Sequence, residues 1–129
     1  MTMKRLSISD LKKPVKRRTR VIELPGGFTA KIQGMLEGER AAFELRNLGP
    51  ENKRRVNLRG YIVAACWVDD DGNRMMSEED VLADWWQGQT STFTEAFSEP
   101  CMELCGFDPE ENLEAELEVA AGNSSNGQG

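Results

Sequence analysis

The chain has 129 residues, of which 39% are hydrophobic and 29% are charged, and its net charge is −6 at pH 7. These values suit one soluble domain with a modest core, and no apolar run reaches the roughly 18 residues that a membrane-spanning helix needs. The sequence contains no histidine and no phosphate-binding glycine loop ending in Lys-Ser/Thr. We therefore expect a protein that is not an enzyme and that carries no cofactor.

The basic and acidic residues are divided along the chain. Residues 1–20 carry +7, residues 21–68 carry +2, and residues 69–129 carry −15. Pro14 interrupts any helix in the first segment, so we interpret residues 1–20 as a basic, partly flexible arm. The division favours self-association, in which the arm of one copy contacts an acidic surface of another. The residues expected to make that contact are Lys12, Lys13, Lys16, Arg17 and Arg18.

A second use of the arm is nucleic-acid binding, because the run KKPVKRR resembles a basic nucleic-acid patch. The arm has no aromatic ring to stack on bases, and the acidic remainder of the chain would repel phosphates. We therefore keep a small nucleic-acid-binding regulator as the alternative function.

The next elements are a hairpin and two helices. Approximate alternation of apolar residues on both sides of a Pro-Gly-Gly turn predicts a β-hairpin over residues 20–35. Residues 51–67 indicate a longer helix whose apolar second half, from Tyr61 onward, should be buried. Between them, a short helix is expected over residues 37–48, with an apolar face of Ala41, Leu45 and Leu48, bordered by Phe43.

The stretch WVDDDGNRMMSEED, residues 67–80, has the acidic spacing of a calcium loop, with candidate ligands at Asp69, Asp71, Asn73 and Asp80. Its sixth position is Arg74, where a calcium loop needs glycine, and its twelfth is Asp80 in place of a bidentate glutamate. We therefore expect no metal there.

The residues of this stretch are also those that favour a turn followed by the start of a helix. Asp-Gly-Asn is a strong turn between Val68 and Met75, which could flank a short hairpin. Ser77 and the three acids after it form a capping box that opens a helix reaching Gln87. The apolar stripe of that helix would consist of Val81, Leu82, Trp85 and Trp86.

A further helix should follow the Trp85-Trp86 pair. Its apolar stripe would contain Phe93, Ala96, Phe97, Met102 and Leu104. Pro100 should kink or split this helix, and Gly106 should cap its end. A last helix is expected after Asp108, and residues 122–129 form a polar, flexible tail by composition.

The three cysteines, Cys66, Cys101 and Cys105, are an odd number without a secretory signal, which predicts reduced thiols. A zinc site would need a fourth ligand, so we expect the cysteines to be buried as small apolar side chains. The predicted fold class is α+β: a mostly helical single domain with an N-terminal β-hairpin. Its parts are the arm (residues 1–20), the domain (residues 21–121) and the tail (residues 122–129).

The order of several short motifs resembles the tail assembly chaperones of long-tailed bacteriophages. A basic lead precedes VIELPGGFTAKIQGMLEGERAAFE (residues 21–44), and an apolar helix runs into ACWVDDDGNRMMSEEDV (residues 65–81). ELCGFDPEE (residues 103–111) and a terminal GNSS (residues 122–125) follow. The resemblance covers roughly residues 20–125, while the basic arm and the Trp85-Trp86 pair depart from the pattern.

The resemblance implies a non-catalytic role in tail morphogenesis. Such chaperones bind the long tape measure protein before tail tube subunits polymerise around it, and they self-associate. The charge division described above predicts that the copies contact one another head-to-tail, in a ring or a spiral. A longer form, made by programmed frameshifting, recruits the tail tube protein. They act in the host bacterial cytoplasm as late proteins and are not in the mature virion, and we expect no membrane partner. The candidate partner-binding residues are Trp85, Trp86, Phe93 and Phe97.

Overall fold

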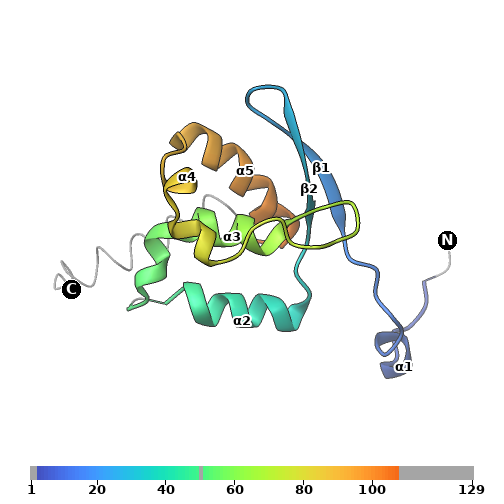
Figure 1. Ribbon diagram of the computed structural model, residues 1–129. Helices are drawn as coiled ribbons and strands as arrows, with labels where there is room; N and C mark the ends of the chain where they lie inside the picture. Colours follow the sequence, from blue (N-terminus) through green and yellow to red (C-terminus); the bar gives the residue numbers. More distant parts are fainter. Residues whose placement is uncertain (1–2, 50, 108–129) are drawn as a thin grey trace.

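The computed structural model of the protein describes residues 3–49 and 51–107, and Figure 1 shows their arrangement. The predicted last helix and the tail lie outside the described residues. The α+β fold with an N-terminal hairpin is confirmed. The helices are α1 (Ile8–Leu11), α2 (Glu37–Asn47), η1 (Lys53–Asn57), α3 (Leu58–Cys66), η2 (Glu79–Leu82), α4 (Asp84–Gln87) and α5 (Ser91–Leu104), where η marks a 3₁₀ helix.

The sheet consists of β1 (Thr19–Leu24), β2 (Phe28–Gln33) and β3 (Trp67–Val68), in the order β1-β2-β3 with antiparallel pairing. The predicted hairpin is β1 and β2, and its turn contains two glycines with φ of 90° and 81°. Only glycine adopts such angles without strain, which explains the Gly-Gly pair. Alternate residues of both strands face the core: Ile22, Leu24, Ala30 and Ile32.

Helix α3 is the centre of the domain. It lies between α5 and α2 in Figure 1, and seven of its nine residues are buried. The predicted burial of its apolar run is confirmed, with Val63 fully buried. The expectation of a single helix over residues 51–67 is wrong, because the first part of this segment forms the separate 3₁₀ helix η1. Asn52 explains the start, because its side chain accepts a hydrogen bond from the Arg54 amide at 2.9 Å and caps η1.

The predicted inner face of α2 is wrong at Ala41 and Leu45, although Leu48, at the end of the helix, does pack against the core. Leu45 is 82% exposed and Ala41 is exposed, whereas Phe43 and Asn47 are buried. The aromatic ring of Phe43 packs against Phe107, with ring centroids 6.1 Å apart. Phe107 lies at the end of the described chain. Because Phe43 packs against it, the Phe43 side of α2 faces the core and Leu45 points outward.

The helix expected from the Ser77 cap to Gln87 is two short helices, η2 and α4. The capping box itself is present: the Asp80 carboxylate accepts from the Ser77 amide at 2.8 Å, and the Asp80 amide donates to Ser77 Oγ at 3.3 Å. Extended backbone at Ala83, with ψ of 150°, separates the two helices. This break places Val81 and Trp86 in the core and leaves Leu82 62% exposed.

Helix α5 continues through Pro100 and is not split, contrary to one of the two outcomes expected. Buried side chains on both sides of the proline, Phe97 and Cys101 among them, hold the helix against α3. Gly106, with φ of 85°, ends it as expected, and the Phe107 amide donates back to the Met102 carbonyl at 2.8 Å.

Candidate interaction surfaces

The four aromatic residues expected to bind a partner form one cluster, but only part of it reaches the surface. Phe97 is 2% exposed and Trp86 is 6% exposed, and their rings meet edge-on at 6.4 Å. Phe93 is half-buried against Phe97. Trp85 is 50% exposed and makes an edge-on contact with Trp86. Phe97 and Trp86 are therefore core residues, and Trp85 is the ring that the cluster presents to solvent.

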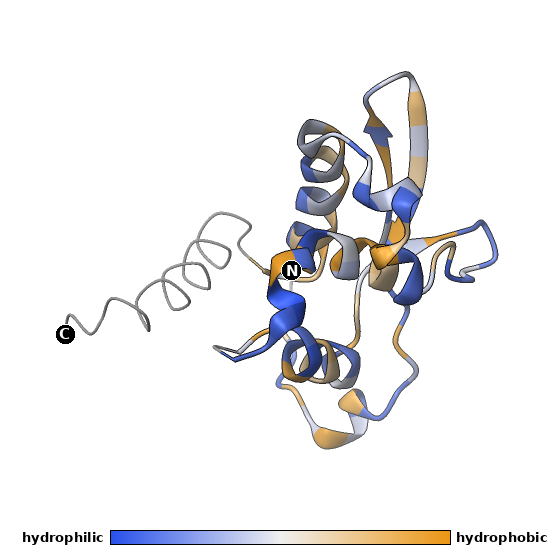
Figure 2. Ribbon diagram, turned by 60° about the vertical axis from the view of Figure 1, so that its left-hand side comes forward, coloured by the Kyte–Doolittle hydropathy of each residue, from blue (hydrophilic) through white to orange (hydrophobic). Residues whose placement is uncertain are grey.

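Large exposed apolar side chains also lie outside this cluster. Figure 2 shows hydrophobic and hydrophilic residues interleaved along the arm, the hairpin and the helices. On the hairpin Val21 is 67% exposed, and on α2 Leu45 is 82% exposed. In the arm the exposed apolar residues are Met3, Leu6, Ile8, Leu11 and Val15. Contact with an apolar partner is therefore possible on several sides of the described molecule.

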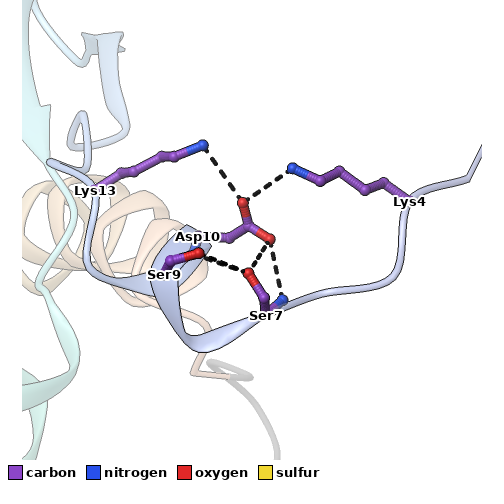
Figure 3. Close-up of polar contacts among 5 residues, drawn as sticks. All are labelled: Lys4, Ser7, Ser9, Asp10 and Lys13. Carbon is purple, nitrogen blue, oxygen red and sulfur yellow. Dashed lines mark hydrogen bonds and ion pairs between the residues drawn. The ribbon is translucent and has the colours of Figure 1, made fainter.

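The arm contains the one-turn helix α1, which lies away from the rest of the domain (Figure 1). Figure 3 shows that Asp10 organises it. The Asp10 carboxylate accepts from the Ser7 amide at 3.0 Å and from Ser7 Oγ at 2.8 Å, and it pairs with Lys4 at 3.1 Å and Lys13 at 3.4 Å. The hydrogen bonds from Ser7 and Lys4 lower the pKa of Asp10. Two of the arm's positive charges are thus paired within the arm.

The end of the arm is attached to the start of α2. Arg17 makes a two-pronged ion pair with Glu39, in which Nη2 lies 2.8 Å from Oε2. The hydrogen bond from Arg17 holds the pKa of Glu39 below its ordinary value. Among the residues expected to contact another copy, Arg17 is therefore used inside the chain and Lys13 pairs with Asp10. Lys12, Lys16 and Arg18 are exposed.

A cleft between α2 and α3 is a feature that the sequence did not indicate. Its volume is about 190 Å³, and its apolar lining residues are Met35, Ala42, Phe43, Tyr61 and Ala65. Four charged residues stand around it: Glu39, Arg46, Arg74 and Glu78. Arg46 pairs with Glu78 at 2.8 Å across the cleft's edge.

Asn47 lines this cleft and is 2% exposed. Its Nδ2 donates to the Phe43 carbonyl at 3.0 Å, while its Oδ1 has no hydrogen-bond partner among the described residues. Buried amide oxygens are nearly always hydrogen-bonded, and this one has almost no accessible surface, so it is an unsatisfied acceptor inside the packing around the cleft and not a group that the cleft exposes.

The acidic stretch after β3 forms a closed turn. Asp69 Oδ1 accepts from the amides of Asp71 at 2.8 Å and Asn73 at 2.9 Å, and Gly72 has φ of 85°. The hydrogen bond from the Asn73 amide is the main reason that the pKa of Asp69 is lowered. Val68 pairs with Arg74 across the turn, one residue before the Met75 expected there. Within residues 3–49 and 51–107, no group of three or more acidic or cysteine side chains could hold a metal ion.

The three cysteines lie together inside the domain, and their predicted burial is confirmed. Cys66 Sγ and Cys105 Sγ are 3.5 Å apart, across the interface of α3 with the end of α5. The neighbouring thiol of Cys101 raises the pKa of Cys66, and the Cys66 thiol and burial raise the pKa of Cys105. Both thiols therefore stay protonated and apolar in character near neutral pH.

Comparison of the chain with protein-family models, curated proteins and solved structures finds no match in any of the three. No helix in the described part of the chain is both long and apolar enough to cross a bilayer.

Proposed function

We propose that this protein is a tail assembly chaperone of a long-tailed bacteriophage, which binds the tape measure protein and assists tail tube assembly. The observation that carries the proposal is the spread of large exposed apolar side chains over a small, highly charged domain. Exposed apolar surface binds apolar segments of a partner, and the surrounding charges keep the complex in solution.

The positions of the motifs behind the resemblance also support this role. The LPGG motif forms the hairpin turn, and GER lies in the first turns of α2. DDGN forms the turn after β3, and SEED forms the cap of η2. These are structural positions that shape one domain, which is what a binding protein without catalytic groups requires. In this proposal the chain acts in the host cytoplasm and is released before the virion matures.

Co-expression with the tape measure protein of the same phage genome tests the proposal. The tape measure protein should be insoluble alone and should co-purify with this chain in the soluble fraction. An unrelated small acidic protein, expressed at the same level, is the control for general effects of co-expression. A tape measure protein that stays insoluble with this chain, or is equally soluble with the control, would contradict the proposal.

A further inference from the structure

A polar pocket lies where the ends of η1 and α4 meet the first turns of α3 and α5. Its volume is about 180 Å³, which is below the roughly 300–1,000 Å³ of pockets that enclose drug-sized ligands. Most of its lining residues are polar: Asn57, Arg59, Gln87, Gln89, Ser91 and Thr94. The pocket therefore suits a small polar group.

The indole N–H of Trp86 is a donor without an acceptor in this pocket. Trp86 is 6% exposed, and its Nε1 atom lies against Gly60, where an added Cβ would be 2.7 Å away. Both residues line the pocket, and no described residue accepts a hydrogen bond from Nε1. Unlike Asn47 Oδ1, this atom is not sealed from solvent. Buried indole N–H groups usually have a partner, so an occupant of the pocket would supply the missing acceptor.

Helix α5 begins at the same pocket and favours negative charge there. The Phe93 amide donates to Thr90 Oγ1 at 3.2 Å, and the Thr94 amide donates to the Thr90 carbonyl at 3.1 Å. The amides of Ser91 and Thr92 have no acceptor among the described residues. Unpaired amides at the start of a helix of 14 residues carry partial positive charge.

Arg59 is the charged residue of the pocket lining. Its Nη2 atom pairs with Glu95 at 3.1 Å, and Glu95 itself is outside the lining. A guanidinium carries several N–H donors, so this one pair leaves others available. Together with the Trp86 indole and the Ser91 hydroxyl, Arg59 makes a set of donors that matches negatively charged oxygen atoms.

We propose that this pocket binds a carboxylate group. Its oxygens accept hydrogen bonds from the Trp86 indole N–H and the Ser91 hydroxyl, and Arg59 supplies the positive charge. Hydrogen bonds to a charged oxygen are about twice as strong as those between neutral groups. The carboxylate belongs either to a small organic acid or to the C-terminus of a peptide, and the experiment below separates the two. This inference does not involve the tape measure protein and stands independently of the proposed function.

NMR titration of the ¹⁵N-labelled full chain with sodium acetate tests the site through the indole N–H signals. The chain has three tryptophans, and the variants Trp67→Phe and Trp85→Phe identify two of their cross-peaks, which leaves that of Trp86. At constant ionic strength, we expect acetate to move the Trp86 cross-peak to saturation and to leave the other two in place. Sodium chloride at the same concentration should not move it.

Two variants test the other donors of the pocket. Arg59→Gln removes the positive charge, and Ser91→Ala removes the hydroxyl. We expect the Kd for acetate to rise about tenfold in each. Thr92→Ala is the matched control, because Thr92 is an exposed residue in the same turn of α5 outside the pocket lining, and this variant should bind acetate like the wild type. Circular dichroism confirms that each variant is folded.

The peptide acetyl-Ala-Ala, with a free or an amidated C-terminus, separates the two sources of the carboxylate. Tighter binding of the free-acid peptide than of acetate supports a site for a chain terminus, and equal or weaker binding supports a site for a small acid. A Trp86 cross-peak that moves with neither acid overturns the proposal. So does an equal response to chloride or to the amidated peptide, or acetate binding that is unchanged in Arg59→Gln and Ser91→Ala.

Discussion

Gly60 shows at residue scale how closely α3 approaches the elements that cover it. A Cβ at this position would lie 2.5 Å from Val81 Cγ1 and 2.7 Å from Trp86 Nε1. Both atoms belong to side chains that are buried in the core. The glycine is therefore required by packing, and its backbone angles need no special freedom.

The variant Gly60→Ala should lower the free energy of unfolding by about 1–3 kcal/mol, because Val81 and Trp86 must move to admit the methyl group. Gly38→Ala is the matched control, since a Cβ there meets nothing within 4 Å in α2. That change should stabilise the protein by about 0.4–1 kcal/mol. Urea denaturation of both variants measures the two effects. Equal stability of Gly60→Ala and the wild type would contradict this account of the α3 packing.

The Asp69 carboxylate stabilises the turn in which it lies, since its Oδ1 atom accepts hydrogen bonds from two backbone amides. We therefore expect calorimetry of the metal-free protein to show no micromolar calcium site, in agreement with the misfit at Arg74 and Asp80. Asp69→Ala should lower the melting temperature and leave the calcium titration flat. Saturable heat that disappears in Asp69→Ala would show that the turn is a metal site.

At the scale of helices and strands, the sequence predicted the features that depend on neighbouring residues in the chain. The hairpin follows from its Pro-Gly-Gly turn, and the end of α5 follows from Gly106. The buried face of α2 could not be predicted in the same way. Two stripes have helical spacing there, and the choice between them depends on Phe107, which lies far along the chain. The cleft escaped prediction for the same reason, because its lining residues come from α2, from α3 and from the segment after β3, which meet only in the folded chain.

The pair between Arg17 and Glu39 attaches the arm to α2 and should make stability depend on pH. The pKa of Glu39 is lowered from its ordinary 4.5, chiefly by the hydrogen bond from Arg17. A lowered pKa in the folded state means that the pair stabilises the fold above about pH 4.5 and is lost as the pH falls through the lower value. Glu39→Gln should thus be less stable than the wild type at pH 7, and the difference should shrink below pH 4.5.

Urea denaturation at pH 7, 4.5 and 3 measures this convergence. Glu44→Gln on the same helix is the control, because it removes an exposed pair with Arg40 that should contribute little. A Glu39→Gln difference that is the same at all three pH values would show that the side chain acts by packing alone.

At the scale of the whole molecule, charge is separated but balanced. Residues 108–129 contain six acids and no basic residue, so residues 1–107 are neutral in total. Within them, residues 1–68 carry +9 and residues 69–107 carry −9. Such a dipolar chain can orient a second copy, while apolar contacts supply most of the affinity.

Removal of residues 1–16 should weaken self-association and reduce its dependence on salt, because Lys12 and Lys16 are lost while the Arg17 pair and β1 remain. Sedimentation at low and high salt, with the full and the shortened chain, checks this. The double variant Lys12→Gln, Lys16→Gln separates loss of charge from loss of the apolar arm. Identical behaviour of full and shortened chains in both buffers would exclude the arm from the contact.

The burial of all three cysteines has a practical consequence for labelling. Thiol-directed dyes react with exposed thiolates, and Cys66, Cys101 and Cys105 are enclosed in the domain. A cysteine introduced at Ser9 in the arm should therefore take up one maleimide dye per folded chain, with the native cysteines left in place. Fluorescence from that single position would then report whether the arm is free or bound when copies assemble.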